Sequence, residues 1–287
     1  MYHLRHIPGK MGHIHYLSNY CGFTMYDMVA YDCKHNEENG EHNRDGFDYN
    51  CSWNCGAEGE TDDVAVNRLR IRQIKNAMCL LMFAQSTPLI FMGDEFGNTQ
   101  FGNNNPYCQD NLTTWLDWSL QEKNTEVFCF WKDLVRFRRE NALLHPETEL
   151  KMMDYLGVGY PDLSFHGSEA WRPCTEPFYR QLGMMLCGKY AESNHGDVVN
   201  TEAVRTDGDT DDAGMIYIAM NMYRDTCEMG LPKVPEGKRW KLVITTIAKD
   251  EKDVLESANG LSNEAASGKH GYPIRLGPKC IAVYITE

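Results

Sequence analysis

The hydrophobic pattern divides the chain into two parts with different periods. Before residue 145, apolar residues recur at helical spacing over Met25–Tyr31, about residues 63–85 and Asn124–Glu140. Thr61 or Asp62 is the expected cap of the second helix. Two short apolar runs predict strands, Ile14–Ser18 before the first helix and Pro88–Met92 between the second and the third. Strands that alternate with helices favour an α/β architecture with parallel strands.

From Glu149 onward the pattern predicts strands without long helices, and turn residues separate the apolar runs. An antiparallel β-sandwich of about six to eight strands fits this rhythm. We therefore predict two domains, residues 1–145 (α/β) and 146–287 (β-sandwich), with a mobile loop over Glu192–Ala213. The expected strands are Leu150–Met153, Leu163–His166, Gln181–Cys187, Met215–Met222, Trp240–Thr246 and Cys280–Thr286.

The stretch Thr87–Asn111 is the strongest candidate for function in the first part. Its apolar run stops at Gly93, and Asp94 and Glu95 open a long loop rich in Asn and Gly. A buried strand that ends in acids is typical of the C-terminal face of a (β/α) barrel. The alternative interpretation is a buried strand followed by a solvated loop whose Asn and Gly residues only shape turns.

Charge and cysteine content narrow the class of partner. A formal charge of −13 argues against nucleic acid and anionic membranes, because phosphate groups would be repelled. No run approaches the length of about 18 apolar residues that spans a bilayer. The 11 cysteines are scattered, and Cys79, Cys129, Cys187 and Cys280 lie in apolar runs. This usage favours buried, reduced thiols and predicts a cytoplasmic protein.

Several motifs together resemble one enzyme family. They are N-Y-C-G-F-T-M-Y-D-M-V-A-Y, K-H-N-E-E-N-G-E-H-N-R-D-G, S-W-N-C-G-A-E-G, Q-S-T-P-L-I-F-M-G-D-E-F-G and G-N-N-N-P-Y-C-Q-D-N followed by W-L-D-W. In this order they resemble the isoamylase and bacterial glycogen-debranching branch of the α-amylase superfamily (glycoside hydrolase family 13). The resemblance is close over Ile14–Leu144 and looser over the rest.

This resemblance implies a fold and an activity. Members have a (β/α)₈ TIM barrel followed by a β-sandwich. They hydrolyse α-1,6 branch points of glycogen, amylopectin or pullulan with retention, using an Asp nucleophile, a Glu acid/base and a second Asp. Ile14–Ser18 and Pro88–Met92 then correspond to the seventh and eighth barrel strands.

The chain departs from the family at the catalytic positions. The nucleophile and the acid/base lie on the fourth and fifth strands, which have no counterpart here. The remaining carboxylate follows the seventh strand in a His-Asp pair, and this chain has Tyr20-Cys21 there. A thiol is neutral near pH 7 and a weak acceptor, so Cys21 cannot replace a carboxylate. We therefore expect no catalytic residue and no activity from this chain alone.

Sugar-binding sites combine aromatic rings that stack on sugar faces with amides and carboxylates that bind hydroxyl groups. Two segments, His35–Trp53 and Asp94–Asp110, offer both. We expect no cofactor and no metal. Cys51 and Cys55 lie near His35 and His42, but a structural zinc site usually has two such Cys or His pairs, so we interpret this spacing as incidental. The predicted substrate contacts are Tyr20, Asn43, Arg44, Asp45, Trp53, Asp94, Glu95, Phe101, Asn105, Tyr107, Gln109 and Asp110.

Three hypotheses for function remain open at this point. Two parallel strands cannot close a barrel, so the chain is either a fragment of a longer debranching enzyme or a subunit that completes its barrel with an N-terminal half. The third hypothesis is a non-catalytic homologue that binds α-glucan. The sequence does not choose among glycogen, starch and pullulan, and it does not give the oligomeric state.

Overall fold

A computed structural model describes residues 1, 4, 13–191, 214–248 and 271–287 of this chain. Contacts divide the chain into two units. The first is His13–Glu140, and the second is Asn141–Glu287 together with Met1–Gly12. The predicted loop Glu192–Ala213 lies outside the described residues.

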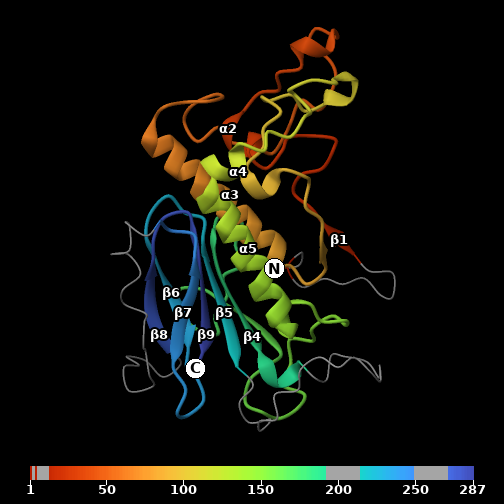
Figure 1. The fold of residues 1–287 in the computed structure, drawn as a ribbon. Helices are drawn as coiled ribbons and strands as arrows, with labels where there is room; N and C mark the ends of the chain where they lie inside the picture. Colours follow the sequence, from red (N-terminus) through yellow and green to blue (C-terminus); the bar gives the residue numbers. More distant parts are fainter. Residues whose placement is uncertain (2–3, 5–12, 192–213, 249–270) are drawn as a thin grey trace. The chain divides into compact units, whose positions relative to one another are not determined.

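The first unit contains one pair of short parallel strands, of which Figure 1 labels β1. β1 is Ile14–His15, shorter than the predicted Ile14–Ser18. β2 is Thr87–Pro88 and shares only Pro88 with the predicted Pro88–Met92, so that prediction was largely wrong. One further hydrogen bond extends the pair, from the Leu89 amide to the His15 carbonyl at 2.8 Å. The pair has no third strand in the described part of the chain, and the apolar side chains of Leu89 and Ile90 are about 40% exposed.

The helices of this unit are α2 (Asp27–Ala30), α3 (Val64–Phe83), α4 (Leu120–Lys123) and α5 (Thr125–Glu140). α3 begins at Asp63, whose carboxylate accepts hydrogen bonds from the Ala65 and Val66 amides. The prediction of Thr61 or Asp62 as the cap was therefore wrong by two positions or by one. An Asp at this position satisfies two backbone donors that the first turn leaves unpaired.

α3 and α5 lie side by side (Figure 1), and a buried arginine joins them. The guanidinium of Arg138 donates to the carbonyls of Met82, Ala84 and Ser86 at the C-terminal end of α3. Burial lowers the pKa of Arg138 to about 10. The last carbonyls of a helix lack partners within the helix. Because Arg138 binds carbonyls from Met82 to Ser86, it holds the segment between α3 and β2 and so fixes where β2 can start.

The second unit consists of antiparallel sheets. A five-stranded sheet has the order β3-β4-β5-β9-β7, and β6 pairs with β8. The strands are β3 (Leu163–His166), β4 (Gln181–Cys187), β5 (Met215–Asn221), β6 (Cys227–Pro232), β7 (Trp240–Thr245), β8 (Gly271–Leu276) and β9 (Cys280–Thr286).

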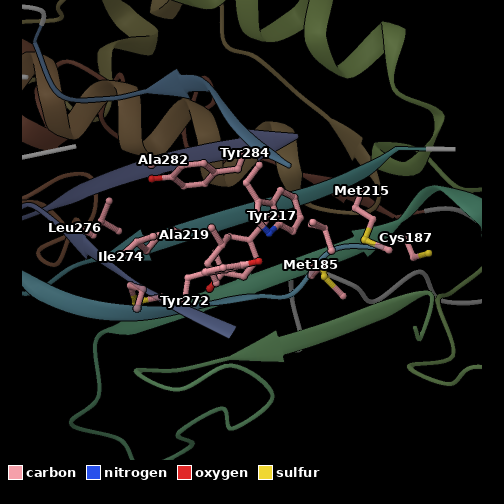
Figure 2. Packing of buried hydrophobic residues seen from close by; sticks show 14 of the residues in the cluster. Met185, Cys187, Met215, Tyr217, Ala219, Tyr272, Ile274, Leu276, Ala282 and Tyr284 are labelled. Atoms are coloured by element: carbon pink, nitrogen blue, oxygen red, sulfur yellow. The ribbon is translucent and has the colours of Figure 1, made fainter. Parts of the chain in front are cut away.

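Both sheets contribute to one apolar core, of which Figure 2 shows part. Tyr217 of β5 is fully buried in it, and its hydroxyl donates to the Gly230 carbonyl of β6 at 3.0 Å. Asn221 at the end of β5 donates to the carbonyls of Leu276 and Gly277 beside β8. These polar links set the register between the sheets, which apolar packing alone specifies less tightly.

Five of the predicted strands are confirmed to within one residue, and Leu150–Met153 was wrong. Those residues belong to an irregular segment organised by buried Asp162, which accepts hydrogen bonds from the Lys151 and Met153 amides. β6 and β8 were missed because Gly230, Pro232 and Pro273 interrupt their apolar pattern.

Three of the four cysteines that lie in apolar runs are buried as predicted. All eleven cysteines are free, and Cys79, Cys187 and Cys280 are buried. Cys129 is exposed because it lies on the outer side of α5, where the apolar run continues onto the surface.

Candidate functional site

Two polar loops of the first unit interlock through asparagine side chains. Asn36 and Asn104 form a reciprocal pair: the Asn36 amide group donates to Asn104 Oδ1 at 2.9 Å, and the Asn104 backbone donates to Asn36 Oδ1 at 3.0 Å. Asn39 and Asn103 exchange side-chain hydrogen bonds in the same way. Both loops lie at the same end of the unit (Figure 1).

This network gathers several predicted contact residues around Asn39. Asp45 Oδ2 accepts from the amide groups of Asn39 at 2.8 Å and Asn105 at 2.9 Å. The hydrogen bond from Asn39 is the main reason that the pKa of Asp45 lies below its usual value. Gln109 donates to Asn39 Oδ1 at 2.9 Å, and Asn43 accepts from the Asn36 backbone at 2.9 Å.

Glycine permits the close approach of the two loops. Gly46 has a φ of +71°, and a Cβ there would strike Asn104 Oδ1 and lie 2.7 Å from Asn36 Nδ2. At Gly102, with a φ of +77°, a Cβ would lie 2.7 Å from the Tyr31 ring. Only glycine combines this backbone conformation with that space.

The segment with Tyr20 and Cys21 joins the same network. The Gly22 amide donates to the Asn104 carbonyl at 2.9 Å, which places Tyr20-Cys21 next to the asparagine loops. The Cys21 amide donates to Asn19 Oδ1 at 2.7 Å, and its thiol is exposed. Tyr20 and Tyr107 present their rings to solvent, with 79% and 76% of their surface exposed.

Sequence reasoning left two exposed aromatics out of the contact set. Asn104 Nδ2 donates to the Phe47 carbonyl at 2.7 Å, so the segment with Phe47 and Tyr49 belongs to the network. Both rings are exposed. Their position in a polar loop could have indicated these two residues, because a large aromatic side chain in such a loop stays exposed instead of packing into a core.

Asp94 occupies a different environment from the one expected for a substrate contact. It is 1% exposed, and its two oxygens accept hydrogen bonds from the Ser18 hydroxyl and from the Met25 amide. Burial raises the pKa of Asp94 to about 7, although both hydrogen bonds oppose that rise. The carboxylate thus ties the exit of β1 to the exit of β2 from inside the protein.

Asp27, which follows β1, binds the segment that follows β2. The sequence did not reveal this role. Its carboxylate accepts from the Thr99 hydroxyl at 2.5 Å and from the Gln100 amide at 2.9 Å. Asp27 is fully buried, and this burial raises its pKa to about 6. An acid inside the apolar run M-Y-D-M-V-A was the available signal, because buried acids require such partners.

The remaining predicted contacts lie outside the asparagine network. Glu95 accepts from the Gly93 amide and faces α5, and Trp53 donates from its backbone to the Met28 carbonyl. Arg44 is exposed and donates to the Glu41 carbonyl. Asp110 accepts from the Trp115 ring nitrogen, and exposed Phe101 adopts a φ of +55°.

Glu58 is a further carboxylate that supports the polar loops, and the sequence did not reveal it. It accepts hydrogen bonds from the Asp32 and Cys33 amides, and Asn54 and His35 also contact it. Desolvation opposes its charge, yet these donors hold the pKa of Glu58 at about 2. The ionised side chain therefore anchors the start of the first polar loop.

No group of three or more His, Cys, Asp or Glu side chains in the described residues is placed to hold a metal ion. None of the described helices has the length and apolarity required to cross a membrane.

The chain is similar in sequence to debranching enzymes. Residues 179–272 match the family described as "Isoamylase, C-terminal". A "Glycogen operon protein GlgX homolog" of Mycobacterium tuberculosis is 50% identical over 130 residues, which are 45% of this chain and 18% of that protein. "Isoamylase SU1, chloroplastic" of Zea mays is 33% identical over 258 residues, 88% of this chain and 28% of that protein.

The fold is similar to that of a solved pullulanase. The enzyme from Paenibacillus barengoltzii, in complex with maltohexaose and alpha-cyclodextrin, superposes with a TM-score of 0.52 and 13% identity. The match covers 95% of this chain and 29% of the pullulanase. The chain spans about a fifth to a quarter of the length of the two curated relatives. By these matches residues 179–272 form an isoamylase C-terminal region, and the chain is homologous to the glycogen operon protein GlgX and to isoamylases.

Proposed function

We propose that this chain forms the glucan-binding edge of an enzyme that hydrolyses α-1,6 branch points in glycogen, amylopectin or pullulan. The relatives support the activity by their names, glycogen operon protein and isoamylase. The pullulanase of similar fold was solved with maltohexaose. The role of β1, β2 and the helices as the last two β/α units of a (β/α)₈ barrel is part of this proposal.

The observation that carries the proposal is the pairing of exposed tyrosines with a rigid amide network. Tyr20 and Tyr107 offer open ring faces, and Gly22 ties the first of them to the Asn104 loop. Aromatic faces pack against the C–H surface of a sugar, while amides and carboxylates bind its hydroxyl groups. Asn105, Gln109 and Asp45 supply such groups on one fixed scaffold. Asp94 is not part of this contact set because it is buried.

Hydrolysis requires carboxylates that this chain does not place at the matching positions. Retaining glycosidases use two carboxyl groups about 5–5.5 Å apart across the bond. The one family position that falls inside this chain holds Cys21, whose thiol cannot act as a fixed anionic acceptor. The proposed division of labour is glucan binding by this chain and bond cleavage by residues elsewhere in the complete enzyme.

Co-sedimentation with glycogen tests the binding part of the proposal. The 287-residue chain should be retained by glycogen without releasing reducing ends. Tyr20→Ala/Tyr107→Ala should lose most of this retention, whereas Phe178→Ala, which removes an exposed ring from the second unit, should keep it. Equal retention of all three proteins would refute the tyrosine site, and release of reducing ends would refute the division of labour.

An apolar groove favours a second candidate role, that of a subunit that completes a barrel with an N-terminal half. The groove has a volume of about 750 Å³ between α5 and the segment after β2. Its Ile90, Met92 and Val135 side chains are 40% to 58% exposed. Parallel strands are normally covered on both faces, whereas Ile14 of β1 is 58% exposed.

Co-expression with the N-terminal half of a relative tests this second role. Recovery of pullulan hydrolysis that Met92→Asp/Val135→Asp abolishes would support it. A monodisperse chain that captures no N-terminal half would count against it. We propose the cytoplasm as the location, and note that the maize relative is named chloroplastic.

A further inference from the structure

A polar pocket of about 540 Å³ opens on the first unit, apart from the asparagine network. None of its lining residues is among the proposed glucan contacts. All of them belong to His13–Glu140, so the pocket is complete within one unit. The lining residues are Tyr26, Glu60, Thr61, Asp62, Asn67, Ile71, Gly97, Thr99, Leu120, Lys123 and Asn124.

Gly97, which has no side chain, keeps part of the pocket open. Gly97 has a φ of +72°, and a Cβ there would lie 3.2 Å from Asn124 Nδ2 and 3.8 Å from the Tyr26 ring. A side chain at this position would therefore narrow the space between the aromatic wall and the amide wall. Glycine also tolerates the left-handed conformation that ends the short turn Asp94–Phe96.

The amides that line the pocket are held in place from behind. Asn67 donates from its side chain to the Thr61 carbonyl at 2.7 Å. Asn124 donates to the Phe96 carbonyl at 2.9 Å. Because these bonds fix the planes of both amides, a ligand meets preorganised groups and loses less affinity to side-chain ordering.

The charge of the lining selects the class of ligand. Glu60 and Asp62 stand against one cation, Lys123. Two carboxylates beside one ammonium group disfavour phosphates and other anions. Carboxylates, amides and the Thr61 hydroxyl suit a ligand rich in hydroxyl groups. Ile71, Leu120 and the ring of Tyr26 offer apolar surface for its C–H faces.

We propose that this pocket is a second carbohydrate site, which binds a neutral α-glucan segment of one or two glucose units. The assignment to α-glucan rests on the proposed function. The volume lies in the range of small-molecule sites, about 300–1,000 Å³. The pocket is also connected to the link between the two strand exits, since Thr99 lines the pocket and donates a hydrogen bond to Asp27.

Titration of the 287-residue chain with maltose, followed by amide NMR shifts, tests the assignment. Gly97 and Thr99 report on the pocket, while Gly22 and Asn105 report on the loops. Glu60→Ala/Asp62→Ala removes two acceptors from exposed positions. Asp225→Ala/Glu236→Ala is the matched control, because it removes two exposed acids from the second unit. Tyr20→Ala/Tyr107→Ala removes the loop contacts.

The expected result is a maltose-dependent shift at Gly97 and Thr99 that Glu60→Ala/Asp62→Ala weakens by about tenfold or more. The control variant and Tyr20→Ala/Tyr107→Ala should leave it unchanged. Shifts confined to Gly22 and Asn105 would overturn the pocket assignment and leave the proposed function standing. Pocket shifts without loop shifts would support this inference while the proposed tyrosine site failed. Equal shifts with inorganic phosphate would overturn the ligand class.

Discussion

Thr99 donates a hydrogen bond from its hydroxyl to the carboxylate of Asp27 over 2.5 Å, although 72 positions separate them in sequence. Asp94 makes the opposite connection, because it reaches back to Ser18 and to the Met25 amide. Each strand exit thus carries a buried acid that binds the other exit. The exposed residue Tyr20 lies in the loop after β1, and Tyr107 lies in the loop after β2. The distance between the two rings therefore depends on both acids.

Loss of the Asp27 carboxylate should destabilise the chain. Asp27→Ala leaves the Gln100 amide and the Thr99 hydroxyl without their buried acceptor, which costs about 1–3 kcal/mol of unfolding free energy. Urea denaturation measures the loss. Asp133→Ala is the control, since Asp133 is exposed and pairs with Arg136 on the surface. Equal midpoints for the two variants would show that the link carries no stability.

The second buried acid predicts a pH dependence. The pKa of Asp94 is about 7 in the folded chain and near 3.8 in the unfolded chain, so the folded state binds the proton more tightly. Its favourable contribution is complete below about pH 4 and is lost as the pH rises through 7. Between pH 5 and pH 7 the loss is at most about 1.4 kcal/mol per pH unit.

Asp94→Asn should remove this slope. Wild type should lose stability relative to Asp94→Asn between pH 5 and pH 8 in urea titrations at each pH. Asp27, with a pKa of about 6, adds a slope of the same sign to both proteins. Glu58, with a pKa of about 2, changes only below this range. Parallel pH profiles for wild type and variant would contradict the assignment.

The sequence predicted helices and most strands because their signals are local. α3 and α5 have apolar faces at helical spacing, and β4 and β9 are continuous apolar runs. β6 and β8 escaped notice because their stability comes from pairing with each other, and Gly230 and Pro273 face each other in that register. Cross-strand pairing is not written in either segment alone.

The candidate site was harder to predict for a related reason. An acid at a strand end can face solvent or turn inward, and Asp94 turns inward because Ser18 and Met25 offer it donors from a segment about 70 positions away. The exposed tyrosines were predictable from their polar surroundings. The asparagine network that supports them was not, because Asn36 and Asn104 find each other only in the folded chain.

Close packing of the two loops predicts a difference between two glycines. Gly46→Ala should destabilise the chain more than Gly40→Ala, by about 1–3 kcal/mol. Both glycines have positive φ, so the strain of a left-handed alanine is common to the two variants. Only at Gly46 does the new Cβ strike Asn104, whereas nothing lies within 4 Å of it at Gly40. Urea midpoints measure both, and equal losses would mean that the loops can separate at little cost.

Restoring a carboxylate at the degenerate position should strengthen glucan binding. Cys21→Asp replaces an exposed thiol with an anionic acceptor, and hydrogen bonds to a charged group contribute about 1.5–3 kcal/mol each. The turn itself should persist, because its hydrogen bond runs from the residue 21 backbone to Asn19. Calorimetry with maltotriose should give about tenfold tighter binding for Cys21→Asp than for wild type.

Cys21→Asn separates charge from shape in this prediction. It has nearly the size of Asp and can accept hydrogen bonds, but it carries no charge, so its gain should be clearly smaller. If Asp and Asn raise affinity equally, shape and neutral hydrogen bonding suffice. If neither changes it, position 21 does not face the bound sugar, and the resemblance at this position does not extend to its role.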